Sequence, residues 1–267
     1  MPVLQALTTG QLLDRIFTVY RKNFLLFFSI ALVPQVCYLI TFGVPTAVLG
    51  RSPSVSGVVA MVITMLVGIV IYIGAMGLSQ GATVVAVSDL YLDKPASAME
   101  AFRHTWPIKW RLVGLIIGYG LLVVLGIILL IIPGVYWLVT YALATAVMAN
   151  ERVSFSEAMS RSKDLVAGNR GRIAIILLLS FVISYAVAFG IGIPVQLGVV
   201  ALARTIPVAA TLLGMAVQLV AAAVAAPISL IGFTLAYYDA RVRKEAFDLH
   251  YMMESEGAAA AAASTGA

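Results

Sequence analysis

Five long stretches of the sequence contain no Asp, Glu, Lys or Arg, and they constrain the fold more than any other feature. They are residues 23–50, 52–88, 112–150, 173–203 and 205–238. Each is long enough to cross a bilayer, since about 20 apolar residues suffice for a membrane helix. Charged residues make up only 11% of the chain, against about 25% in soluble domains. The sequence therefore predicts an all-α polytopic membrane protein and excludes a soluble enzyme, a disordered chain and a nucleic-acid-binding protein.

The third stretch has about twice the length that one span needs. Pro133 and Gly134 lie near its middle, and this dipeptide ends a helix and starts a turn. We therefore expect a tight hairpin of two spans there. The six predicted transmembrane helices are residues 24–42, 58–88, 112–132, 135–150, 173–200 and 207–238. Residues 1–250 are expected to form one membrane domain, followed by a flexible tail, residues 251–267, rich in Ala, Gly and Ser.

Basic residues predict the orientation of the spans. All Lys and Arg residues except Arg51 and Arg204 fall in the N-terminal arm, the loops 89–111 and 151–172, and the C-terminal tail. Short loops rich in Lys and Arg stay on the cytoplasmic side of a membrane. We therefore expect a bacterial inner-membrane protein whose N- and C-termini are both cytoplasmic. Residues 43–57 and 200–206 are expected on the opposite side.

Three segments on the predicted cytoplasmic side share a pattern typical of helix starts. Each has Ser or Thr followed three residues later by Glu or Gln, as in a capping box. The pairs are Thr8 with Gln11, Ser97 with Glu100, and Ser154 with Glu157. An apolar stripe at helical spacing follows each pair. The stripes are Leu12, Leu13, Ile16 and Tyr20; Met99, Phe102, Trp106 and Trp110; and Phe155, Ala158, Met159, Leu165 and Val166.

We expect these segments to be cytoplasmic amphipathic helices that lie in the membrane interface. Their apolar sides would then reach about 5–10 Å into the head-group region. Basic residues follow each stripe, and they are candidate contacts for lipid head groups: Arg21, Lys22, Lys109, Arg111, Arg170 and Arg172. Connectors that any six-span protein needs would show the same pattern, so the sequence leaves a purely topological role open.

Four groups of residues share their pattern with a known family. They are residues 13–17 with 20–24 (LDRIF and YRKNF), 132–134 (IPG), 156–162 (SEAMSRS) and 236–248 (AYYDARVRKEAFD). Together they resemble the bacterial membrane domain named after glycerophosphoryl diester phosphodiesterases. The resemblance extends over residues 8–250. Some family members place this domain before a catalytic barrel, and no barrel is expected here, so the resemblance implies no hydrolase activity.

Residues 77–81 (GLSQG) match the nucleophile-elbow pattern around Ser79. That pattern works on a turn between a strand and a helix, whereas here it falls within a predicted membrane helix. A serine nucleophile also needs a base, and the only histidines, His104 and His250, lie in a predicted loop and in the tail. We therefore predict no catalytic residue and no enzyme activity.

Small residues offer another explanation of the same segment. Gly77 and Gly81 are four residues apart, a spacing that lets a second membrane helix approach closely. Gly114 and Gly118 in the third predicted span have the same spacing. We expect helix contacts at both pairs.

Metal and cofactor sites are not expected. The only cysteine, Cys37, lies in an apolar run, and the two histidines are far apart in sequence, so no cluster of metal ligands is apparent. Residues 190–194 (GIGIP) lack the third glycine and the preceding strand of a nucleotide-binding loop. We expect a kink or a helix end there.

The six predicted spans contain no Asp, Glu, Lys, Arg or His. Ion-coupled transporters carry such residues at membrane depth, so this absence argues against proton or sodium coupling. Other polar residues are present, and we expect them to hydrogen-bond between helices, with the lining of a substrate route as the alternative. They are Gln35, Ser79, Gln80, Tyr119, Ser180, Ser184, Tyr185, Gln196 and Gln218.

Charged residues begin where the sixth span ends, and they are Asp239, Arg241, Arg243, Lys244, Glu245 and Asp248. One interpretation is a solvated helix end with ion pairs four residues apart, such as Arg241 with Glu245. The other is a cytoplasmic docking surface against the amphipathic segments.

The sequence as a whole predicts a non-enzymatic membrane protein whose cytoplasmic face contacts lipid head groups, especially anionic ones, or a protein partner that the sequence does not identify. The alternative is a transporter or flippase for a lipid-like molecule, using the long fifth and sixth spans with Pro194 and Pro227. A third interpretation, a membrane module of glycerophosphodiester metabolism, follows only from the name of the family.

Overall fold

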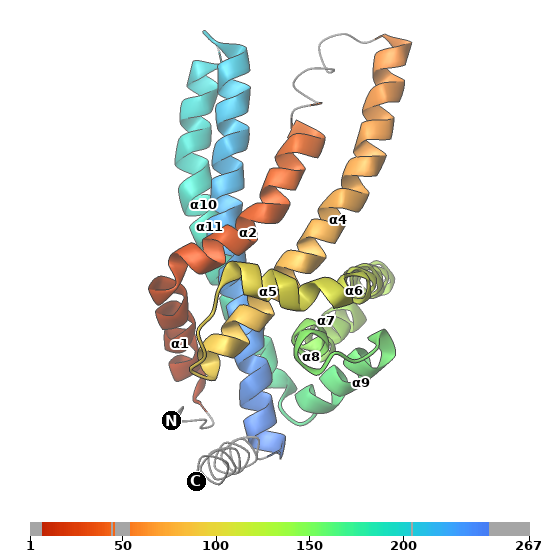
Figure 1. Ribbon diagram of the computed structural model, residues 1–267, viewed down its shortest axis with the longest axis vertical. Coiled ribbons are helices and arrows are strands. Elements are labelled where there is room, and N and C mark those ends of the chain that lie inside the picture. Colours follow the sequence, from red (N-terminus) through yellow and green to blue (C-terminus); the bar gives the residue numbers. More distant parts are fainter. Residues whose placement is uncertain (1–6, 44, 46–53, 204, 246–267) are drawn as a thin grey trace, which may run out of the picture.

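The computed structural model describes residues 7–43, 45, 54–203 and 205–245, and this part of the chain consists of helices and short connections (Figure 1). Within the described residues, six segments are long and apolar enough to cross a membrane, which confirms the predicted all-α bundle. They are Phe24–Gly43, Val55–Tyr91, Ala98–Leu129, Ile131–Glu151, Arg170–Leu202 and Ala209–Glu245. Arg51, Arg204 and Asp248 lie outside the described residues, as do most of residues 43–57 and the tail.

The helices follow one another with short connections. They are α1 (Thr9–Lys22), α2 (Phe24–Tyr38), the π-helix η1 (Leu39–Gly43), α4 (Val55–Tyr91), α5 (Ala98–Thr105), the 3₁₀-helix η2 (Trp106–Ile108), α6 (Lys109–Leu129), α7 (Ile131–Thr140), α8 (Ala144–Glu151), α9 (Phe155–Val166), α10 (Arg170–Leu202) and α11 (Pro207–Glu245). Helix α10 continues through Gly190 and Pro194, so the structure has a continuous helix where the sequence also allowed a helix end.

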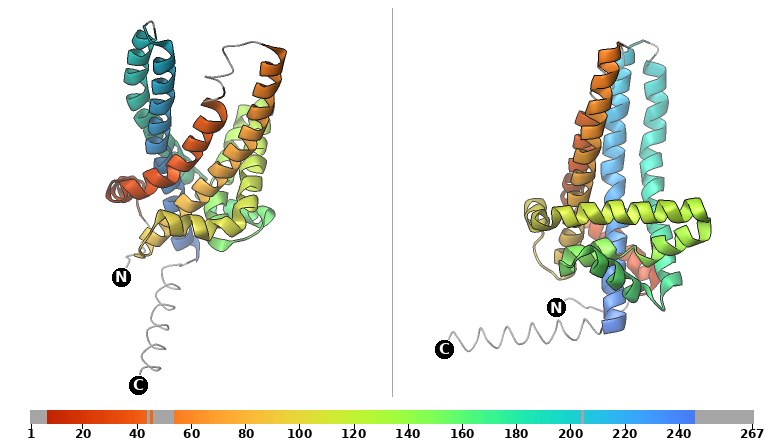
Figure 2. Two further views of the ribbon diagram at one scale, coloured as in Figure 1. Left: turned by 45° about the horizontal axis from the view of Figure 1, so that its top comes forward. Right: turned by 90° about the vertical axis from the view of Figure 1, so that its right-hand side faces the viewer.

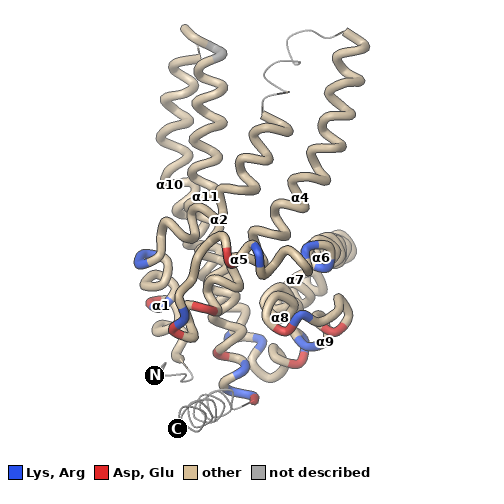
Figure 3. The backbone as a smooth tube through the Cα atoms, viewed as in Figure 1, with Lys and Arg blue, Asp and Glu red and all other residues tan. Residues whose placement is uncertain are grey.

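Two helix pairs run lengthwise and separate toward one end of the molecule. In Figure 1, α10 lies beside α11, and α2 rises toward the same end as α4, at a distance from the first pair. Helices α6 and α7 lie across these long helices, as the right-hand view in Figure 2 shows. The charged residues of the described chain gather at the opposite end, around α1, α5, α9 and the last turns of α11 (Figure 3). We call this the charged end.

Two of the three predicted capping boxes are complete. At Thr8 and at Ser154, the first and fourth residues of the box bind each other reciprocally through side chain and backbone. The hydrogen bonds from Ser154 lower the pKa of Glu157. The Ser97 hydroxyl accepts the N–H of Glu100 at 3.2 Å, but among the described hydrogen bonds the reciprocal one is absent, so this box is half formed.

Two of the three apolar stripes differ from the prediction, because they face the core of the protein. Leu12 and Ile16 of α1 and Leu165 of α9 are at most 1% exposed. Helix α1 packs against α10 and α11, and α9 packs against α8, so protein rather than lipid removes these side chains from water. The second stripe keeps apolar side chains on the surface, with Met99 79% and Trp110 71% exposed.

Glycines in α4 mark the place where α6 crosses it. A Cβ at Gly77 would lie 3.3 Å from Val113 Cγ2 of α6, and one at Gly81 would lie 2.5 Å from Thr105 Cγ2 of α5. The predicted close contact at this pair is therefore confirmed. Gly114 differs from the prediction, since a Cβ there would meet no atom within 4 Å. Gly118 instead lies against the ring of Phe155 in α9.

The predicted hairpin is present, but it turns earlier than expected. Leu130 is extended between α6 and α7, and Pro133 lies inside the first turn of α7. Proline is tolerated in a first turn because the N–H that it lacks has no partner within the helix. The arms approach so closely that a Cβ at Gly126 would lie 2.8 Å from Gly134 Cα. The turn is apolar and exposed, with Ile132 82% exposed.

Candidate functional site

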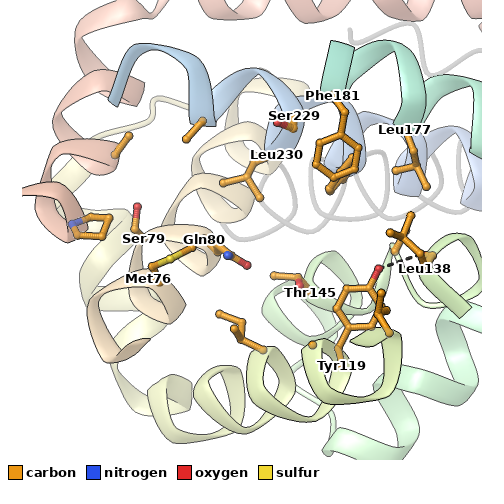
Figure 4. Close-up of a pocket in the computed structure, with 18 of the residues that line it drawn as sticks. Met76, Ser79, Gln80, Tyr119, Leu138, Thr145, Leu177, Phe181, Ser229 and Leu230 are labelled. Atoms are coloured by element: carbon orange, nitrogen blue, oxygen red, sulfur yellow. Dashed lines mark hydrogen bonds between the residues drawn. The ribbon is translucent and has the colours of Figure 1, made fainter. Parts of the chain in front are cut away.

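A cavity of about 610 Å³ lies where the two helix pairs meet the crossing hairpin (Figure 4). Helices α2, α4, α6, α7, α8, α10 and α11 all contribute residues to its wall. Its volume falls within the range of pockets that hold small ligands, about 300–1,000 Å³. The cavity is therefore large enough for part of an organic molecule and lies at the centre of the fold.

The wall of the cavity is mostly apolar. Leu177, Phe181, Leu230 and Phe233 of α10 and α11 face residues of α2, α4 and α6 across it. No lining residue is Asp, Glu, Lys, Arg or His. The polar lining residues are Gln35, Ser79, Gln80, Tyr119, Thr145, Tyr185 and Ser229. Such a wall suits an uncharged, largely hydrocarbon group that carries a few hydrogen-bonding atoms.

The cavity extends from near the charged end into the bundle. Ile116 is five residues after Arg111 and Thr145 is six residues before Glu151, whereas other lining residues lie farther from charges. Gln80 is nine residues before Asp89 in α4, and Ser229 is ten residues before Asp239 in α11. At a rise of about 1.5 Å per residue, these side chains lie roughly 14–15 Å along their helices from the nearest acidic residue.

Three polar groups of the wall tie helices together, as the sequence predicted for this class of residue. The Ser79 hydroxyl of α4 donates to Ile30 O of α2 at 3.0 Å. The Tyr119 hydroxyl donates to Leu138 O at 2.8 Å and joins α6 to α7. Ser229 lies 2.8 Å from Ser184 of α10. These bonds hold the walls of the cavity in place.

The glutamines behave differently. No hydrogen bond among the described residues includes the side-chain amide of Gln35 or Gln80. Figure 4 shows the Gln80 side chain extending into the space between Thr145 and Leu230. An amide there is available to a bound molecule, because it offers two donors and one acceptor oxygen.

The charged residues at the end of α11 bind other parts of the same chain. Asp239, which is 2% exposed, accepts the N–H of Leu7 at 3.0 Å. Its carboxylate also lies 3.0 Å from Arg172 Nη2 of α10 and 3.0 Å from Arg243 Nε of its own helix. Arg172, predicted to contact lipid head groups, is thus in a partly buried ion pair. The acid, both arginines and the N-terminal segment form one cluster.

A second cluster joins α11 to α8 and α9. Arg241 Nε lies 3.0 Å from Glu245 Oε2, the pair predicted from sequence. Arg161 of α9 pairs with Glu245 and with Glu151 of α8, the latter at 3.4 Å. The Tyr237 hydroxyl donates to Glu151 at 2.8 Å. Lys244 similarly donates to a backbone carbonyl of α9, that of Asp164.

The other head-group candidates lie on the surface of the charged end. Arg21 and Lys22 are exposed at the last turn of α1. Arg170 is exposed at the start of α10, with its guanidinium 5.1 Å from the centre of the Tyr136 ring. Contact between these residues and lipid remains a prediction.

Two further candidates, Lys109 and Arg111, lie in the first turn of α6, directly after η2. Lys109 Nζ lies 3.7 Å from the centre of the Trp106 ring, an arrangement that favours a cation over the ring face. Arg111 Nη1 donates to Arg152 O at 2.9 Å and so joins α6 to the end of α8. Both side chains therefore have contacts within the chain.

The cavity itself was not predicted, and neither were Thr145 and Ser229 as parts of it. Both are small hydroxyl residues within predicted spans. The sequence alone does not distinguish a hydroxyl residue that lines a cavity from one that bonds to the backbone of its own helix. Gln35 and Gln80 were predicted as polar residues at membrane depth, and that signal does point to the cavity.

Comparisons with protein-family models, curated proteins and solved structures found no match for the chain. The resemblance to the membrane domain named after glycerophosphoryl diester phosphodiesterases remains a prediction from sequence. The cavity and the charged end are therefore the observations that bear on function.

Proposed function

We propose that this chain is a non-enzymatic, multi-pass protein of the bacterial inner membrane that binds a lipid-like amphiphile in its central cavity and carries it through the membrane. The observation that supports this most is the cavity, because it combines apolar walls with the amide of Gln80, which has no hydrogen-bond partner among the described residues. A hydrocarbon chain can pack against the apolar walls. An ester, amide or hydroxyl group of the same molecule can form a hydrogen bond with the Gln80 side chain.

The arrangement of the helices supports a route as well as a site. The α10–α11 pair and the α2–α4 pair separate toward the end opposite the charges. At the charged end, the clusters around Asp239 and Glu245 connect α1, α8, α9, α10 and α11. These ion pairs close the proposed state at the charged end.

The proposal places the charged end in the cytoplasm. Lys and Arg in short loops are retained on that side of a bacterial membrane. Most of the basic residues near the span ends in the described chain lie at the charged end (Figure 3). Both termini are then cytoplasmic, since the chain enters and leaves the bundle at this end.

A cavity-filling substitution tests the proposal. Gly120 of α6 lines the cavity, and a Cβ there would meet no atom within 4 Å. Gly120→Leu should therefore fill the cavity without a backbone clash. Gly114→Leu is the matched control, because it adds the same side chain to the same helix at a position that does not line the cavity and is equally free of contacts.

The measurement has two parts, both on the full chain. Native mass spectrometry after detergent purification reports retained lipid, and reconstituted vesicles with a fluorescent phospholipid report transfer between leaflets. We expect Gly120→Leu to lower both about tenfold or more and Gly114→Leu to leave both unchanged. Wild-type behaviour of Gly120→Leu in both assays would contradict the proposal.

A further inference from the structure

A second hollow at the charged end is lined by basic residues from two separate parts of the chain. Arg103 and His104 of α5 face Arg152, which follows α8, and the hollow has a volume of about 520 Å³. Ser97, Met99 and Glu100 complete the lining. This hollow shares no residue with the central cavity.

The basic groups are close together, and neither arginine has an ion-pair partner among the described residues. Arg152 Nη2 lies 3.3 Å from Nδ1 and 3.1 Å from Nε2 of His104, so the guanidinium lies against the imidazole ring. Glu100 is the one acid in the lining. Asp89, outside the lining, interacts electrostatically with His104. The two guanidinium groups of the lining outnumber its one carboxylate, which favours an anion.

The backbone holds Arg152 in this position at a conformational cost. Its φ of 54° and ψ of 29° are left-handed, a conformation that is uncommon for residues other than glycine. The carbonyl of Arg152 accepts a hydrogen bond from Arg111 Nη1 at 2.9 Å, which fixes the backbone from α6. Arg111 also adds a further positive charge beside the hollow.

Apolar side chains next to the hollow are exposed. Met99, in its lining, is 79% exposed, and Trp106, two residues after His104, is 56% exposed. Trp110 in the next turn is 71% exposed. Tryptophans of membrane proteins are enriched at the lipid–water interface. The hollow therefore has beside it exposed side chains of the kind that membrane proteins place at the level of the head groups.

We propose that Arg103, His104 and Arg152 bind the phosphate of an anionic phospholipid, with the Met99 and Trp106 side chains against its glycerol and acyl region. Guanidinium groups suit this role, since each offers two parallel N–H donors to phosphate oxygens. The site is independent of the central cavity and of any transport through it.

The test compares two doubly substituted full-length proteins with equal charge. Arg103→Gln with Arg152→Gln removes two guanidinium groups from the hollow. Arg15→Gln with Lys163→Gln removes two exposed basic groups elsewhere at the charged end. Each variant is placed in nanodiscs of phosphatidylcholine with a small fraction of phosphatidylglycerol, extracted, and analysed by native mass spectrometry for bound phosphatidylglycerol.

We expect the hollow variant to retain about thirtyfold less phosphatidylglycerol, since each of the two basic residues at an anionic surface contributes about 1 kcal/mol. The control variant should retain as much as wild type. Arg103→Gln alone, which removes no described hydrogen bond, should give a smaller loss with unchanged thermal stability. Equal retention by wild type and the hollow variant, or equal loss in the control variant, would overturn the proposal.

Inorganic phosphate distinguishes a lipid from a soluble phosphate. An excess of inorganic phosphate added before extraction should leave phosphatidylglycerol bound, because phosphate alone gains nothing from Met99 and Trp106. Displacement of the lipid by inorganic phosphate would overturn the assignment to lipid. Retention of phosphatidylglycerol by the hollow variant is measured separately from transfer of lipid between leaflets. A negative result for this site therefore does not bear on the transport proposal.

Discussion

The guanidinium of Arg172 lies 3.0 Å from the buried carboxylate of Asp239, and this ion pair joins the start of α10 to the end of α11. The same carboxylate accepts the N–H of Leu7, so the segment before α1 is held in place as well. Arg172 and Arg243 both donate to Leu7 O. One acid therefore fixes three parts of the chain at the charged end.

Asp239→Asn should destabilise the protein more than any surface charge change. Removal of the charge leaves Arg172 partly buried without its acid, and breaking a buried pair costs about 3 kcal/mol or more. We expect a clear fall in the melting temperature in detergent. Asp14→Asn, the same change at an exposed position of α1, should melt within error of wild type. Equal melting of the two variants would show that the Asp239 cluster does not stabilise the fold.

Gly81→Leu should prevent the normal approach of α5 and α6 to α4. A Cβ at Gly81 would lie 2.5 Å from Thr105 Cγ2 and 2.6 Å from Leu112 Cδ1, and overpacking of this kind costs about 1–3 kcal/mol. Gly74→Leu on the same helix is the control, because a Cβ there would meet no atom within 4 Å. The yield of monodisperse protein after size-exclusion chromatography should fall for Gly81→Leu only, and equal yields would contradict this packing.

Ser79→Ala should leave leaflet transfer intact while lowering stability slightly. The substitution removes the hydrogen bond to Ile30 O, which contributes about 1 kcal/mol. Thermal melting and the vesicle transfer assay measure the two effects on the same preparation. Loss of transfer at unchanged melting temperature would instead indicate a chemical role for this hydroxyl.

Cysteine labelling tests the orientation in a Cys37→Ala background. Ser156 of α9 and Ser56 near the start of α4 are both exposed. A membrane-impermeant maleimide added to intact spheroplasts should label Ser56→Cys and leave Ser156→Cys unlabelled until the membrane is opened. Labelling of Ser156→Cys from outside would place the charged end on the extracytoplasmic side and contradict the proposed orientation.

Helix number and the presence of the hairpin follow from the sequence because charge-free length is a local signal. The exact turn does not, since it lies at Leu130 and Pro133 is in the first turn of α7. The burial of Leu12, Ile16 and Leu165 does not, since an apolar stripe has the same pattern whether it packs on lipid or on protein. The sequence likewise does not show where α6 crosses α4. Gly77 and Gly114 are both glycines within predicted spans, yet only Gly77 has a close neighbour.

The candidate site was less predictable than the fold. Gln80 is visible in the sequence as a polar residue at membrane depth, but only the structure shows its amide directed into a cavity between seven helices. Likewise, Arg152 and His104 are 48 residues apart in the chain. Their contact depends on the positions of α5 and α8 on α4, which no short motif encodes.

The central claim is that a lipid-like molecule occupies the cavity, and photocrosslinking from its wall tests this most directly. Benzoylphenylalanine replaces Phe181, which lines the cavity, or Leu178, which is on the same helix and 62% exposed. The protein is washed extensively in detergent and irradiated, and adducts are identified by mass spectrometry. We predict a lipid adduct from position 181 that survives the wash, with the adduct from position 178 lost as surrounding lipid is removed. Absence of any lipid adduct from position 181, or its loss in parallel with that from position 178, would contradict a lipid-binding cavity.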